Sequence, residues 1–397
     1  MTACNKRLTG RYRLSVSHVH GQNGIAGCAV LAMIGILPLV AGPACIESDT
    51  LSQQVLGLPP FQPADATHNN DGLQTAVGLS PRVHTAAGYI EALTRTLQVA
   101  DVAVVQCTFA WDFLRGRTDG ATYREKYDWI MADEGSDGRN IFQQHGLGSG
   151  FWLSFTDPID TSKIADVDSP IPIRFSDPDV SAAFVSECVW FATHFRPDYL
   201  ALGVEIDSFL EASSTNERQA FLETFTSAYT ACKETCPECV IFVYFQYENV
   251  LSRDLWSLIE PFATASDVFA FSSYPSLPVS GTDTGWTSDT ISESYFDDIP
   301  VRLGSDRPLA IVEFGHPMTS SVHFINGSVP EQATMVERLF RNLDGLDVAL
   351  VTWTYLHDPD LSSVYDQATS QYFGSMGLLR CDQDEVGGPT WEAFFNR

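Results

Sequence analysis

The chain has 397 residues, of which 44% are hydrophobic and 12% aromatic, so it can bury a large core. Its formal net charge is −27, because 50 acidic residues outnumber 23 basic ones. A surface this acidic repels nucleic acid and anionic lipid, which excludes nucleic-acid binding and favours a neutral ligand or an acidic or salty medium. Nothing in the composition implies a protein partner.

The first 44 residues have the composition of a signal segment. They contain four basic residues, no acidic residue and an apolar stretch at 24–42. Pro38 and small residues close this stretch without a basic flank, which favours a signal peptide over a membrane-spanning helix. A retained N-terminal anchor is an alternative. We therefore expect an exported protein.

Cys45 offers a second form of export signal. It could be the lipidated first residue of a bacterial lipoprotein, which would attach the protein to a membrane, although Gly42 stands where such signals prefer Leu. The expected location is therefore secreted, periplasmic or lipid-anchored at the cell surface. Residues 45–52 would form a tether, and 53–397 a single domain.

Segments typical of strands and of helices alternate from residue 54 onward. The expected strands cover 54–59, 101–107, 150–155, 199–205, 240–245, 267–271, 308–313 and 348–353. Helical periodicity predicts helices at 85–97, 123–132, 180–195, 216–232, 251–259, 331–343 and 391–395. The segment 62–82 is polar and carries turn formers, so we expect no strand there.

This alternation predicts an α/β fold. Eight β/α units without an internal linker favour a single (β/α)₈ TIM barrel with enlarged βα loops, preceded by the signal segment and the short tether. A doubly wound open sheet is the rival architecture. It would normally carry a glycine-rich phosphate loop after its first strand, which residues 56–60 do not provide.

Two of the expected strands end in a glutamate. Glu205 ends the fourth strand and Glu313 the seventh, and the carboxyl ends of barrel strands form the rim where such folds keep their chemistry. Strand alternation places Ala201, Gly203 and Glu205 on the inward face, with Val204 among the residues that face the helices.

A pair of carboxyl groups on one rim suits cleavage of a glycosidic bond. One group must be protonated to donate to the leaving oxygen, and the other must be ionised to attack or stabilise the anomeric carbon. Aromatic residues at neighbouring strand ends, namely Trp111, Tyr274 and Trp353, could stack on the apolar face of a sugar.

Four stretches carry a resemblance to a known group of enzymes. These are 200–206 (LALGVEI), 269–275 (FAFSSYP), 309–317 (LAIVEFGHP) and 350–355 (LVTWTY). They resemble clan A of the glycoside hydrolases, retaining TIM-barrel enzymes, and within it most closely the endo-β-1,4-galactanases and endo-β-1,3-glucanases.

The resemblance implies a role for four of these residues. Glu205 would be the acid/base and Glu313 the nucleophile, Tyr274 would hydrogen-bond the nucleophile, and Trp353 would form the floor of the subsite for the attacked sugar. It implies a β-linked carbohydrate substrate and neither a cofactor nor a metal.

One position departs from the pattern of the clan. The residue before the acid/base is usually an Asn that contacts the 2-hydroxyl of the sugar, and here it is Val204. Gln246 or Asp207 could supply the contact instead, and Trp111 is a further candidate for substrate binding. The alternative is a catalytically weak or inactive carbohydrate-binding TIM-barrel surface protein.

The cysteines allow two interpretations. Cys232, Cys236 and Cys239 have the C-x3-C-x2-C spacing of the iron–sulfur motif in radical S-adenosylmethionine enzymes. They follow a helix on the face opposite the expected rim, however, so we favour disulfides in an exported chain, with Cys188–Cys232 and Cys236–Cys239 as candidate pairs.

Overall fold

The computed structural model describes residues 72–395 with several gaps. The residues left out of this range are 83–84, 110, 112–126, 128–129, 131–138, 158–159, 166–172, 278–284, 305, 322–325, 363–364 and 380–387. The expected signal segment, Cys45, the tether and the strand at 54–59 lie outside the described residues, as does nearly all of the helix expected at 123–132.

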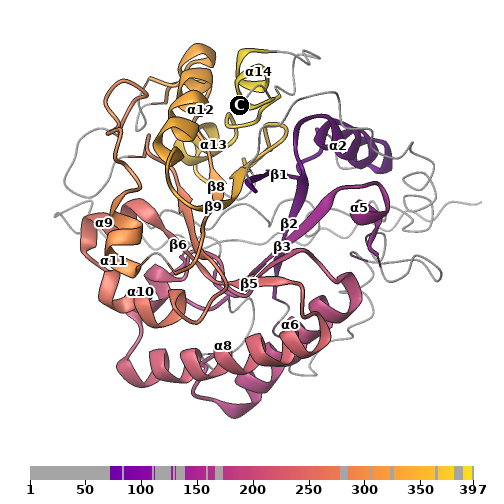
Figure 1. The fold of residues 1–397 in the computed structure, drawn as a ribbon, viewed down its shortest axis with the longest axis vertical. Coiled ribbons are helices and arrows are strands. Elements are labelled where there is room, and N and C mark those ends of the chain that lie inside the picture. The colour runs from indigo at the N-terminus through magenta and orange to yellow at the C-terminus, as the bar shows by residue number, and fades with distance from the viewer. Residues whose placement is uncertain are drawn as a thin grey trace, which may run out of the picture.

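Nine parallel strands form one sheet in the order β5-β4-β3-β2-β1-β9-β8-β7-β6. They are β1 (Gln74–Gly78), β2 (Val102–Thr108), β3 (Gly148–Ser154), β4 (Tyr199–Ala201), β5 (Val240–Phe242), β6 (Tyr244–Gln246), β7 (Phe269–Ser273), β8 (Leu309–Phe314) and β9 (Val348–Trp353). Only Val243 separates β5 from β6, so the two ends of this order belong to one barrel strand and the sheet closes on itself (Figure 1). The predicted TIM barrel is confirmed.

Helices surround this barrel (Figure 1). They are α2 (Ala86–Val99), α5 (Ile141–Gln144), α6 (Pro178–Phe195), α7 (Asp207–Ala212), α8 (Thr215–Thr235), α9 (Tyr247–Arg253), α10 (Trp256–Ala263), α11 (Asp298–Leu303), α12 (Val329–Leu343), α13 (Gln367–Phe373) and α14 (Pro389–Phe395). The single helix expected at 251–259 was wrong, because Asp254 adopts a left-handed conformation with φ of 52° and ends α9 before α10 begins.

The first barrel strand lies where no strand was expected. β1 pairs in parallel with β2 on one side and with β9 on the other. Its five residues include Thr75 and Val77 but lie in a segment rich in polar residues and turn formers, and pairing on both edges stabilises them as a strand. Gly78 permits a close approach, since a Cβ there would lie 1.9 Å from the Thr354 carbonyl oxygen.

The fourth barrel strand is shorter than expected and ends in a bulge. The Leu202 amide donates to Phe242, and the Ile206 amide donates to Tyr244, so four residue steps on one side match two on the other. This bulge breaks the alternation that was predicted. Val204 lies in the cluster that fills the barrel interior, and a Cβ on Gly203 would meet Phe155 on the outer side at 3.1 Å.

Two apolar clusters support the barrel. The interior is filled by residues from all around the sheet, including Ala201, Trp152 and Phe242, with the Trp152 indole N–H donating to the Val312 carbonyl at 3.2 Å. A larger cluster packs the outer face of the sheet against the helices. The strand ends are therefore held rigidly from both sides, which fixes the side chains at the rim.

The four cysteines around α6, α8 and β5 are buried thiols. Neither of the two disulfides considered, Cys188–Cys232 and Cys236–Cys239, is formed. In the part of the chain that the structure describes, no group of three or more His, Cys, Asp or Glu side chains is placed to hold a metal ion. Within the same residues, every helix is too short or too polar to cross a membrane.

Candidate active site

Glu205 is presented by the bulge after β4. Its φ is 43°, a left-handed conformation that is uncommon for a residue other than glycine. The side chain is buried, and the Ser272 hydroxyl on β7 donates to Oε1 at 2.5 Å, whereas Oε2 has no hydrogen-bond partner. Burial, and then the negative charge of Glu313, raise the pKa of Glu205 well above its usual value. Both effects favour the protonated form of Glu205.

Glu313 is the fifth residue of β8 and is also buried. Its two oxygens accept hydrogen bonds from two phenols, Tyr244 to Oε1 and Tyr274 to Oε2, the latter at 2.8 Å. Burial raises the pKa of Glu313 to about 7, and the two phenols act in the opposite direction because they stabilise the ionised form. The contact that we expected between Tyr274 and Glu313 is present.

Burial and the mutual repulsion of the two carboxyl groups therefore favour a single negative charge on the pair. The hydrogen bonds favour the ionised form at Glu313, where two donors meet the carboxylate, and Glu205 has one donor and one open oxygen. Retaining and inverting glycosidases both use a proton donor beside an ionised carboxylate.

A third buried carboxylate, Glu248, supports the site from the first turn of α9. It accepts hydrogen bonds from the Ser273 hydroxyl at 2.5 Å, the Tyr274 amide at 3.1 Å and the Tyr295 hydroxyl at 2.6 Å. Glu248 thus anchors the backbone of the tyrosine that donates to Glu313. Glu248 was not predicted from the sequence, although its position two residues after a barrel strand was an available signal.

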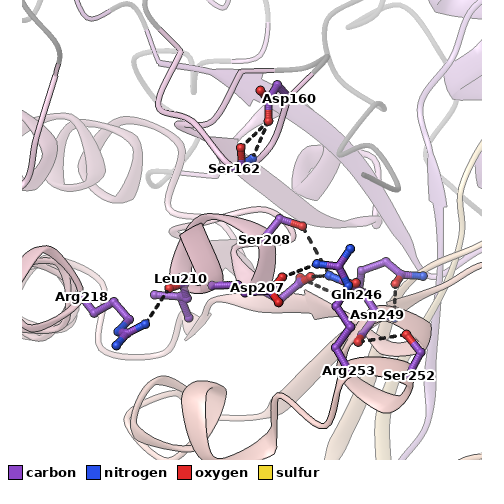
Figure 2. A network of polar contacts seen from close by, with 11 residues as sticks. Asp160, Ser162, Asp207, Ser208, Leu210, Arg218, Gln246, Asn249, Ser252 and Arg253 are labelled. Atoms are coloured by element: carbon purple, nitrogen blue, oxygen red, sulfur yellow. Dashed lines mark hydrogen bonds and ion pairs between the residues drawn. The ribbon is translucent and has the colours of Figure 1, made fainter. Parts of the chain in front are cut away.

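Asp207 and Gln246 are hydrogen-bonded to each other and do not line an open cleft (Figure 2). The backbone amide of Gln246 donates to Asp207 Oδ1 at 2.8 Å, and the side-chain amide of Asn249 donates to Asp207 Oδ2. The Gln246 side chain accepts a hydrogen bond from the backbone amide of Asn249 at 2.5 Å and donates one to the Glu248 carboxylate. Burial raises the pKa of Asp207 to about 6. The two residues tie the start of α7 to the start of α9.

Trp353 and Trp111 are not brought to the carboxyl groups. Trp353 belongs to the outer cluster, where its ring packs against Phe314 and Phe394, and its indole N–H donates to the Met376 carbonyl at 2.7 Å. Trp111 also lies in the outer cluster, stacked on Phe109 at 5.3 Å between ring centroids. Strand alternation explains this for Trp353, because its neighbours Thr352 and Thr354 face the rim.

A small pocket lies beside Glu313. Its volume is about 30 Å³, and besides Glu313 its polar lining includes Gln106 of β2, Thr352 of β9 and Tyr355. None of these three polar residues was singled out from the sequence. The inward positions of the strands at 101–107 and 348–353 could have indicated Gln106 and Thr352.

Comparisons with known proteins identify the fold of this chain but assign it to no family. No family model and no curated protein sequence matches the chain. Among solved structures, an exo-β-1,4-mannosidase from Opitutaceae bacterium strain TAV5 has a TM-score of 0.61 at 15% identity, over 84% of this chain and 61% of that one. The chain therefore spans less than two thirds of the mannosidase.

Two other structures match over nearly their whole length. Xylanase 10B from Thermotoga maritima has a TM-score of 0.55 at 10% identity, over 87% of this chain and 95% of that one. A fungal β-1,4-galactanase has a TM-score of 0.53 at 12% identity, over 88% and 97%. The fold is shared with glycosidases. The resemblance predicted from the sequence is confirmed at this level, and no single family among these enzymes is distinguished.

Proposed function

We propose that the protein is an exported retaining glycoside hydrolase that cleaves β-linked poly- or oligosaccharides with Glu205 and Glu313. The observation that carries this proposal is the unequal hydrogen bonding of two buried carboxyl groups at the ends of the fourth and seventh barrel strands. The activities for which the similar structures are named, those of a β-1,4-mannosidase, a xylanase and a β-1,4-galactanase, support a glycosidic substrate. Export rests on the composition of residues 1–44, with attachment through a lipidated Cys45 as one form of it.

In the first step, Glu205 gives its proton to the glycosidic oxygen while Glu313 attacks the anomeric carbon. The bond to the leaving sugar breaks, and a glycosyl ester forms on Glu313. Forming the ester removes the negative charge of Glu313, which is one of the causes of the high pKa of Glu205. Loss of this charge lowers the pKa of Glu205, so Glu205 stays ionised after it has given up its proton.

In the second step, the ionised Glu205 accepts a proton from water as the water oxygen attacks the anomeric carbon. Glu313 leaves as a carboxylate, which the hydroxyls of Tyr244 and Tyr274 stabilise again. The return of this charge raises the pKa of Glu205 and restores its proton. Two displacements at one carbon give retention of configuration.

The test is a panel of β-1,4-mannan, β-1,4-galactan, xylan and β-1,3-glucan incubated with the full chain. We expect release of reducing sugar from at least one polysaccharide, with retention at the anomeric carbon by NMR. Glu313→Ala should abolish turnover, and azide should partly restore activity of Glu205→Ala on an aryl glycoside. Glu223→Ala, at an exposed position of α8, is the control that should keep full activity. Activity that survives Glu313→Ala would refute the assignment.

A second candidate is a carbohydrate-binding barrel with little or no hydrolysis. Val204 favours it, because this side chain lies in the interior cluster and cannot supply the hydrogen bond that an Asn at this position would make to the substrate. Binding of a polysaccharide from the panel without release of reducing sugar would establish this alternative.

A further inference from the structure

Three buried polar atoms beside Glu313 have no hydrogen-bond partner. They are Gln106 Oε1, Thr352 Oγ1 and the hydroxyl of Tyr355, from residues that are 7%, 1% and 2% exposed. All three residues line the pocket next to Glu313. Buried polar atoms in proteins are nearly always hydrogen-bonded, so a group of three in one pocket indicates a place for a ligand atom.

The size of the pocket limits what it can hold. A volume of about 30 Å³ accommodates roughly two water-sized groups and is far too small for a sugar ring. Part of its wall is apolar and is formed by Val104, Trp152 and Val312. The best occupant is therefore a substituent of two heavy atoms, one apolar and one polar.

The chemistry of the lining selects the polar atom. Gln106 Oε1 can only accept a hydrogen bond, whereas the hydroxyls of Thr352 and Tyr355 can both donate and accept. The lining contains no Lys, Arg or His side chain, and the carboxylate of Glu313 would repel an anion. A neutral group that both donates and accepts meets these conditions, and a hydroxyl is such a group.

We propose that this pocket binds the exocyclic hydroxymethyl group of a hexopyranose, with its carbon against the apolar wall and its hydroxyl among Gln106, Thr352 and Tyr355. The inference rests on the proposed glycosidase function and adds to it a substrate class, hexosides in preference to sugars that lack this hydroxyl. Because the pocket adjoins Glu313, the sugar recognised is the one that Glu313 attacks.

The test compares each 4-nitrophenyl β-hexoside (glucoside, galactoside or mannoside) with its 6-deoxy counterpart, which lacks only the hydroxyl. We expect kcat/KM of the wild-type chain to be about 100-fold or more lower for the 6-deoxy form of the best hexoside, since three polar atoms would stay unpaired. In Thr352→Val and Gln106→Met this ratio should fall to within about tenfold. Both changes remove an unpaired atom at nearly constant volume, so the variants should fold.

Thr354→Val is the matched control. Thr354 also lines the pocket, but its hydroxyl already donates to the Phe314 carbonyl and lies 3.2 Å from the Tyr274 hydroxyl, so it is not one of the unpaired atoms. It should lower kcat/KM for the hexoside and its 6-deoxy form alike and leave the ratio unchanged. A wild-type ratio within about threefold of one would overturn the proposal, as would an unchanged ratio in Thr352→Val.

Calorimetric binding of the free hexose and its 6-deoxy form separates this proposal from the proposed function. If no glycoside is hydrolysed but the hexose binds more tightly than its 6-deoxy form, the glycosidase function fails and the pocket assignment stands. If hydrolysis occurs without discrimination, the function stands and the pocket assignment fails. If no hexose is bound or hydrolysed, both fail.

Discussion

Glu205 has one carboxylate oxygen without a hydrogen-bond partner, whereas both oxygens of Glu313 accept a hydrogen bond from a tyrosine. This asymmetry supports the roles proposed for the pair, because donors stabilise the ionised form of the group they contact. It favours the proton on Glu205, whose open oxygen could transfer it, and the charge on Glu313.

The phenol donors should control the acidic limb of the pH profile. Tyr274→Phe removes a stabiliser of ionised Glu313, so the pKa of Glu313 should rise and the acidic limb of kcat/KM should move to higher pH by about one unit. Tyr372→Phe is the control, because its buried hydroxyl contacts Ser276, 2.6 Å away, and not Glu313. A limb that stays in place in Tyr274→Phe would contradict the assignment of Glu313.

Ser272 should control the alkaline limb. Its hydroxyl stabilises ionised Glu205 and so lowers the pKa of this group, which means that Ser272→Ala should raise the pKa further. Glu205 must be protonated to act as the acid, so the alkaline limb should extend to higher pH. The neighbouring Ser273→Ala removes a donor to Glu248 and should leave this limb where it is. A shift of the limb to lower pH in Ser272→Ala would count against the proposal.

The buried carboxyl groups should make the protein most stable in acid. Burial raises the pKa of Glu205, Asp207, Glu248 and Glu313 in the folded state. Between about pH 4 and each folded pKa, the unfolded chain has lost a proton that the folded chain keeps, so the free energy of unfolding falls as pH rises. For Asp207, with a folded pKa of about 6, this loss is about 3 kcal/mol by neutral pH.

Urea unfolding between pH 4 and pH 8 measures this dependence. Glu205→Gln removes one titrating group while its amide can still accept from Ser272, so the decline with pH should be shallower in this variant. Stability that increases from pH 4 to pH 7 in the wild-type chain would contradict the prediction.

At position 205 we expect glycine to be more stable than alanine, the reverse of the usual order. At most positions alanine is more stable than glycine, but the φ of 43° at Glu205 penalises any Cβ. Glu205→Gly should therefore be more stable than Glu205→Ala by about 1 kcal/mol. At Glu223 in the interior of α8 the order should be the opposite, with glycine less stable by about 1 kcal/mol. Equal stability of the two Glu205 variants in urea unfolding would refute strain at this residue.

The barrel was predictable because its strands and helices repeat a strong pattern. The helix at Pro178–Phe195 has a clear N-terminal signal in Asp177 and Pro178, and the strand at Leu309–Phe314 is a nearly continuous apolar run. β1 was not predictable, since Gln74–Gly78 becomes a strand only through its two neighbours. The same holds for the division between α9 and α10, which depends on the backbone of a single residue, Asp254.

Of the candidate site, the contact between Tyr274 and Glu313 was predictable from the sequence. The inward direction of the Val204 side chain could not be derived, because a bulge shifts the alternation and no periodic signal marks it. The packing of Trp353 against Phe314 and Phe394 depends on α14, which is far away in the sequence. The phenol of Tyr244 lies at the interruption between β5 and β6, where sequence patterns do not resolve orientation.

The bulge that presents Glu205 also has a consequence for the evolution of such a protein. A buried glutamate in a left-handed conformation is unfavourable for folding, so mutation would readily replace it once selection for activity ended. Glycine would be favoured there, and the barrel would persist without it. The residue at position 205 is thus a marker that separates copies of this barrel that still need an acid/base from copies that serve only as scaffolds.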